Sequence, residues 1–162
     1  MADLREQLEV SLQGRVCLMG LGNIDYGDDG LGVRMAERLV ATGIPNVIVA
    51  GNMPERFIDS AISDAFDHLI FLDAVEFGAA PGSVVFLDAE EMANRFPQIS
   101  THKISLGLMA KLVEENGRTK AHLLGVQPDS LKSSAEISTV ARETIDILCE
   151  LITDIRNNPI TD

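Results

Sequence analysis

The sequence lacks tryptophan and is poor in aromatic residues, with six phenylalanines and one tyrosine among 162 residues. Hydrophobic residues still make up 46% of the chain, so a core must be built from aliphatic side chains and methionine. A chain of this length is typical of one domain of ordinary size.

Cysteine is also scarce, since the chain has only Cys17 and Cys149, each in an apolar stretch. No two cysteines are spaced as Cys-x-x-Cys, which excludes zinc ribbons and thioredoxin-type redox chemistry. We expect buried free thiols, because a reactive thiolate needs a polar and exposed environment. The sequence also lacks a Gly-x-Ser-x-Gly nucleophile elbow and a His-Glu-x-x-His zinc motif, which argues against covalent catalysis and against a zincin.

Basic residues are outnumbered, with 13 Lys and Arg against 25 Asp and Glu and a net charge of −12. This balance argues against nucleic acids and anionic membranes as partners, because both attract proteins through Lys and Arg. No apolar run reaches the roughly 20 residues of a transmembrane helix. The first residues form a charged helical pattern that differs from a signal peptide, so we expect a cytoplasmic protein.

Short apolar runs alternate with helical patterns along the chain, which is typical of an α/β protein. Continuously apolar strands indicate a parallel sheet that is covered on both faces. The fourth strand follows the third too closely for a helical crossover and should be antiparallel. We predict a three-layer α/β/α sandwich with a mainly parallel, roughly five-stranded sheet and one antiparallel strand. Strands are expected at 15–20, 47–50, 68–73, 83–87 and 121–126, and helices at about 30–40, 54–62, 88–95, 104–115 and 139–155.

The predicted α/β domain covers residues 15–162, and a helical extension over residues 1–14 precedes it. Its final helix, over residues 139–155, has a stripe of mostly apolar residues near one face. The members of the stripe are Ile137, Val140, Thr144, Ile147, Leu148 and Leu151.

Candidate functional residues follow the predicted strands, because ligands of open α/β sheets bind beyond the carboxyl ends of the strands. Asp28 and Asp29 follow the first strand, Asp73 ends the third, and His102 lies in the loop after the fourth. Capping of the next helix could explain one of the two adjacent acids, and Asp73 could cap a turn. Asp29, Asp73 and His102 together would form a set of two carboxylates and one imidazole that suits a divalent first-row metal.

The glycine turn after the first strand and two further histidines are not predicted to be functional. The glycine turn after the first strand is not a dinucleotide fingerprint, because Asp25 stands where the third glycine belongs and neighbouring acids would repel a pyrophosphate. His68 and His122 lie near the starts of their strands, away from the expected site, and are predicted to be structural.

Four separated segments resemble, in order, the maturation endopeptidases of nickel–iron hydrogenases, with the formate-hydrogenlyase branch the most similar. The resemblance spans roughly residues 16–155. The segments are Gly20-Leu21-Gly22-Asn23 with Asp28-Asp29-Gly30 and Gly32, Ile70-Phe71-Leu72-Asp73-Ala74 with Pro81-Gly82, Ser100-Thr101-His102, and Leu124-Gly125-Val126-Gln127-Pro128.

This resemblance implies an aspartyl-type endopeptidase that removes a C-terminal extension from the hydrogenase large-subunit precursor after nickel insertion. Asp29, Asp73 and His102 would be both the catalytic residues and the metal ligands. The nickel would be carried by the precursor, and other divalent cations could occupy the site. A monomer is expected. Further candidates for the substrate cleft are Gly22, Asn23, Asp28, Gly51 and Gln127.

Two alternatives stay open at this point. A nickel-dependent checkpoint module could recognise the loaded precursor through the same three residues without cutting it. A nucleotide-binding α/β domain is disfavoured by the acidic turn. The chain also departs from the family where Ala50-Gly51-Asn52 replaces a frequent Asp-Gly-Gly and where Asp25 replaces an apolar residue, which concerns substrate choice and the shape of the cleft.

Overall fold

The computed structural model describes residues 3–95, 105–134 and 136–160. It contains a five-stranded sheet in the order β2-β1-β3-β5-β4. β1, β2, β3 and β5 are parallel and β4 is antiparallel to β5, which confirms the predicted sheet and its one reversed strand. The strands are β1 (Val16–Leu21), β2 (Val47–Gly51), β3 (His68–Ala74), β4 (Val84–Asp88) and β5 (Lys120–Val126).

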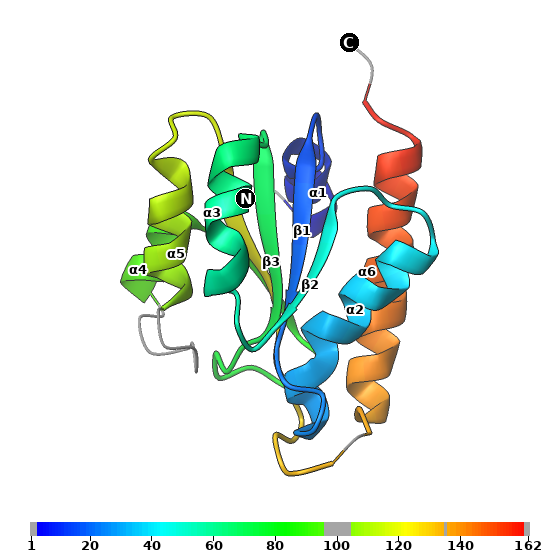
Figure 1. Ribbon diagram of the computed structural model, residues 1–162. Coiled ribbons are helices and arrows are strands. Elements are labelled where there is room, and N and C mark those ends of the chain that lie inside the picture. Colours follow the sequence, from blue (N-terminus) through cyan, green and yellow to red (C-terminus); the bar gives the residue numbers. More distant parts are fainter. Residues whose placement is uncertain (1–2, 96–104, 135, 161–162) are drawn as a thin grey trace.

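Helices cover both faces of the sheet, so the molecule has the three layers that the sequence predicts (Figure 1). One layer consists of α3, α4 and α5, and the other of α2 and α6, with α1 packed on the same face as the latter pair. A short 3-10 helix, η1 (Gly27–Gly30), precedes α2. The helices are α1 (Leu4–Ser11), α2 (Leu31–Ala41), α3 (Glu55–Asp64), α4 (Ala89–Arg95), α5 (Leu106–Glu114) and α6 (Thr139–Asn157).

The core is divided into two halves by the alternation of side chains along the buried strands. In β3, Leu69 and Phe71 point toward α3 and α5, whereas Ile70 and Leu72 point toward α2 and α6. All six residues of β1 are buried, as expected for a strand with helices on both sides.

Helix α1 is packed into the second half of the core through Leu8 and Leu12, which are 0% and 2% exposed. Its connection to β1 is fixed by Arg156 of α6, whose Nη1 donates hydrogen bonds to the carbonyl oxygens of Leu12 and Gly14 at 2.6 and 3.0 Å. Among the described residues, no helix has the length and apolar content to cross a membrane.

The buried face of α6 overlaps only partly with the stripe seen in the sequence. Ile147 is 66% exposed, and the buried stripe is offset from that one. Both stripes are apolar, so periodicity alone could not choose between them. The buried members are Ala141, Ile145, Leu148, Cys149, Ile152 and Ile155.

Candidate functional site

The candidate site lies where β1 and β3 end and α2 begins. Gly32, in the first turn of α2, makes this junction possible because the helix backbone rests directly on the ends of both strands. A Cβ atom on Gly32 would lie 2.5 Å from the carbonyl oxygen of Leu21 and 2.8 Å from the carbonyl carbon of Leu72. Asp29 precedes Gly32 by three residues and Asp73 follows Leu72, so the close packing brings both acids to one edge of the sheet.

In the η1 turn, the side chains of Asp28 and Asp29 point in different directions. A 3-10 helix has three residues per turn, so neighbouring side chains diverge by about 120°. Asp28 is buried, with 1% of its surface exposed, whereas Asp29 is only partly buried. Oδ2 of Asp29 accepts a hydrogen bond from the backbone N–H of Asn23 at 3.0 Å. The η1 turn therefore leaves Asp29, and not Asp28, as the accessible acid.

The alternative role of these acids as caps of the next helix is wrong. The N-cap of α2 is Gly30, which has no side chain to supply a cap. The carboxylate of Asp28 instead accepts hydrogen bonds from the segment before α6, namely from the backbone N–H groups of Asp129 and Ser138 and from the Ser138 hydroxyl, at 2.7–2.8 Å. Asp28 is therefore a buried structural anchor at the base of the site.

Asp73 lies at the carboxyl end of the central strand β3 and is 5% exposed. Its Oδ1 accepts a hydrogen bond from the backbone N–H of Ala74 at 2.9 Å. A carboxylate in such a position needs compensation by donors or by a cation, because burial of an uncompensated charge is costly.

The third predicted ligand, His102, lies outside the described residues, as do its neighbours Ser100 and Thr101. Within the described ranges, no group of three or more His, Cys, Asp or Glu side chains is placed to hold a metal ion. The described part of the site thus contributes two carboxylates, Asp29 and Asp73.

Glycines at the ends of β1 and β2 allow the chain to fold closely around these acids. Gly22 has a φ of +120°, and a Cβ atom there would collide with the carbonyl oxygen of Asp29. Its N–H donates a hydrogen bond to the carbonyl oxygen of Gly51 at 2.9 Å. Gly22, Asn23 and Gly51, all expected near a cleft, therefore lie together beside Asp29.

Gln127 follows β5 and is 5% exposed. Its Oε1 accepts hydrogen bonds from the N–H groups of Phe77 and Ala79, at 2.8 and 3.3 Å, and its Nε2 donates to Glu76 at 2.8 Å. The side chain therefore fixes the loop that follows Asp73.

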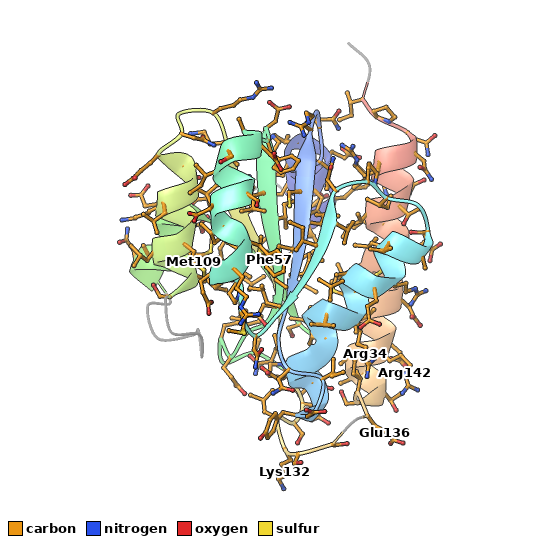
Figure 2. The ribbon with its side chains drawn as sticks, in the orientation of Figure 1. Arg34, Phe57, Met109, Lys132, Glu136 and Arg142 are labelled. Carbon is orange, nitrogen blue, oxygen red and sulfur yellow. The ribbon has the colours of Figure 1, made fainter. Side chains whose placement is uncertain are left out.

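The candidates drawn from the sequence did not include Ser130, Ser134 or Ser138, which form hydrogen bonds with η1 in the connection before α6. Lys132 and Glu136 of the same connection, together with Arg142 of α6, line a hollow of about 410 Å³ beside η1. Figure 2 labels these three side chains. The only local signal was Ser138, which precedes a helical pattern and is the N-cap of α6.

The remaining histidines and both cysteines lie away from this edge. Nδ1 of His68 and Nε2 of His122 are 3.2 Å apart near the amino ends of β3 and β5. Burial lowers the pKa of His68, and burial together with the neighbouring His68 lowers the pKa of His122 to about 4. Cys17 and Cys149 are buried free thiols, as predicted.

Comparison with known proteins gives a consistent family assignment. The family model described as hydrogenase maturation protease (HycI) matches residues 33–155. The Hydrogenase 3 maturation protease of Escherichia coli K12 is 34% identical over 115 residues, which cover 69% of this chain and 72% of that protein.

Solved structures agree with this assignment. The [NiFe] hydrogenase maturation protease HycI from Thermococcus kodakarensis KOD1 superposes with a TM-score of 0.82 at 32% identity, covering 94% of this chain and 99% of that one. The hydrogenase maturating endopeptidase HybD from E. coli gives a TM-score of 0.74 at 26% identity, covering 88% and 93%. The chain therefore belongs to the hydrogenase maturation protease family.

Proposed function

We propose that this protein removes a C-terminal extension from the large-subunit precursor of a nickel–iron hydrogenase once nickel has been inserted. In this proposal Asp29, Asp73 and His102 contact the nickel that the precursor carries. Family membership supports the protease activity, and the placement of Asp29 and Asp73 at one edge of the sheet is the observation that supports the role of the metal.

The donor set suits this task chemically. Carboxylate and imidazole ligands bind divalent first-row metals, and three protein ligands leave coordination positions for groups of the precursor. Recognition of the metal would make cleavage conditional on nickel loading, because an empty precursor would lack the ion that joins the two proteins.

Hydrolysis would then depend on how the scissile peptide bond is positioned against the two carboxylates. Contact between the three ligands and the precursor's nickel would hold the scissile peptide bond beside Asp29 and Asp73. Water adds to the peptide carbonyl and loses a proton, and the departing amine gains one. Either carboxylate could accept the proton from water, and the nickel ion could polarise the reacting groups.

A processing assay on nickel-loaded precursor tests this proposal. We expect Asp29→Asn, Asp73→Asn and His102→Ala each to slow cleavage by at least about 100-fold, since each removes a group from the reacting centre. Asp64→Asn is the matched control, because Asp64 is an exposed acid at the end of α3, far from the carboxyl ends of the strands, and it should cleave at the wild-type rate.

The assay also separates the alternatives. Full cleavage by Asp29→Asn and His102→Ala would defeat the proposed site. A wild-type protein that binds nickel-loaded precursor but leaves its length unchanged, as measured by intact mass, would be a checkpoint module instead of a protease.

A further inference from the structure

The carboxylate of the buried Asp28 accepts hydrogen bonds from both ends of the loop between β5 and α6, at Asp129 and at Ser138. Its Oδ2 accepts from the Asp129 N–H at 2.8 Å and from the Ser138 hydroxyl at 2.7 Å, and its Oδ1 accepts from the Ser138 N–H at 2.8 Å. Bonds of this kind, with a charged acceptor, are stronger than neutral ones and compensate the burial of the carboxylate. Asp28 thus holds the two ends of this loop, Asp129 and Ser138, together.

The middle of the same loop is bonded to the η1 turn. The N–H groups of Asp28 and Gly27 donate to the carbonyl oxygens of Ser130 and Ser134 at 3.0 and 2.7 Å, and the Ser134 N–H donates to the backbone carbonyl oxygen of Asp25 at 2.9 Å. Gly27 has a φ of +57°, and a Cβ atom there would lie 2.9 Å from the Ser130 oxygen. The loop therefore rests directly on the turn that carries Asp29.

These bonds restrain the rotation of η1 about its own axis. A four-residue 3-10 helix has too few internal hydrogen bonds to fix its own rotation, so external contacts must do so. With Asp28 held inward, the geometry of the turn directs Asp29 outward, where the N–H of Asn23 binds its Oδ2. A small rotation of η1 would move the carboxylate of Asp29 relative to Asp73.

We infer that Asp28 is a positioning residue of this site, which acts through η1 to hold Asp29 in the orientation that the reaction requires. The inference rests on the proposed function for its activity measurement and extends it, because Asp28 itself contacts neither precursor nor metal. Ser138 contributes by supplying two of the three donors, while its hydroxyl also accepts from the Ala141 N–H at the start of α6.

Asp28→Asn is the test variant, since it keeps the size of the side chain but turns one acceptor into a donor that faces a backbone N–H group in either amide orientation. We expect kcat for precursor cleavage to fall by about 10- to 100-fold with KM changed less than threefold, because misplacement by about 1 Å has such effects on rate. Ser138→Ala removes one donor of the three and should lower kcat in the same direction by a smaller factor.

The amide proton of Asn23 provides a measurement that needs neither substrate nor metal. Asp29→Asn weakens the acceptor of this N–H and so defines the NMR shift of the loosened state. We expect the Asn23 resonance of Asp28→Asn to move toward that value, and that of Ser138→Ala to move part of the way. If wild-type protein fails to cleave precursor, the proposed function fails, while this shift still tests the positioning role.

Asp67→Asn is the matched control for loss of a structural carboxylate. Asp67 binds the Arg15 N–H and the Arg118 guanidinium before β3, at the opposite end of the sheet, so its variant should keep the wild-type kcat and Asn23 shift. A wild-type Asn23 shift in both Asp28→Asn and Ser138→Ala would overturn the inference, whatever happens to kcat. An equal loss of kcat in Asp67→Asn would also overturn it, since the effect would then be general destabilisation. If Asp28→Asn does not fold, Ser138→Ala decides by the same criteria.

Discussion

Gly32→Ala should damage the site without touching any acidic residue. The added methyl group would lie 2.5 Å from the carbonyl oxygen of Leu21 and closer still to the carbonyl oxygen of Leu72. Carbon and carbonyl oxygen normally stay at least roughly 3.3 Å apart. Because both obstacles are backbone atoms of buried strands, the start of α2 must retreat by roughly 1 Å, and Asp29 moves with it.

The expected loss of stability is modest, and the expected loss of activity is large. Overpacking costs about 1–3 kcal/mol, while replacement of glycine by alanine in a helix returns up to about 1 kcal/mol. A net loss of about 1–2 kcal/mol would lower Tm by roughly 2–8 °C in a chain of this size. A displacement of Asp29 by roughly 1 Å should reduce kcat by about 100-fold.

Precursor cleavage and thermal unfolding of the same preparation measure these two effects. Leu39→Ala is the matched control, because Leu39 is fully buried in the last part of α2 and its truncation costs about 2–5 kcal/mol without crowding the junction. It should lose more stability than Gly32→Ala and yet retain kcat within about twofold at a temperature where the protein is folded. Wild-type kcat and Tm in Gly32→Ala would refute the argument that close approach of α2 to the strands sets the site.

Two further predictions concern groups away from the site. Above pH 6.5 His122 is neutral in both folded and unfolded chains, but between pH 6.5 and 4 the unfolded chain gains a proton that the folded protein excludes, so stability should fall by up to roughly 1.4 kcal/mol per pH unit. Urea unfolding at pH 7 and 5 measures this loss, and an undiminished pH dependence in His122→Asn would contradict it. Burial raises the pKa of Cys17 to about 12 and that of Cys149 to about 11. Ellman's reagent should therefore react with these thiols only after unfolding, and rapid reaction in native buffer would contradict the assignment.

The strands could be predicted because their apolar runs are continuous and separated by strong turn signals. Leu69–Leu72 is such a run, and the polar Asp73 that follows it marks the end of β3 at which we propose the site. The antiparallel direction of β4 followed from the short connection between β3 and β4, and the structure confirms it. These are local properties, so one sequence is enough to reveal them.

Other features depend on contacts between distant residues, for which a single sequence has no signal. Asp28 and Ser138 are 110 positions apart, and nothing near either residue predicts their hydrogen bonds. Which apolar stripe of α6 is buried likewise depends on the elements that pack against the helix, so periodicity alone could not show that Ile147 is exposed. The sequence did indicate that capping could not account for both adjacent acids, and it left open which of them was structural.

The opposite orientations of Asp28 and Asp29 constrain the length of the loop before them more than its composition. Deletion or insertion of one residue between Gly22 and Asp28 would shift both acids by one position in the turn. The anchoring acid would then face solvent, and the exposed acid would enter the protein interior. Substitutions at Ile24 and Tyr26, which are 40% and 48% exposed, leave the positions of Asp28 and Asp29 in the turn unchanged. Variation among homologous proteases should therefore appear here as exchanges of residue type at constant spacing.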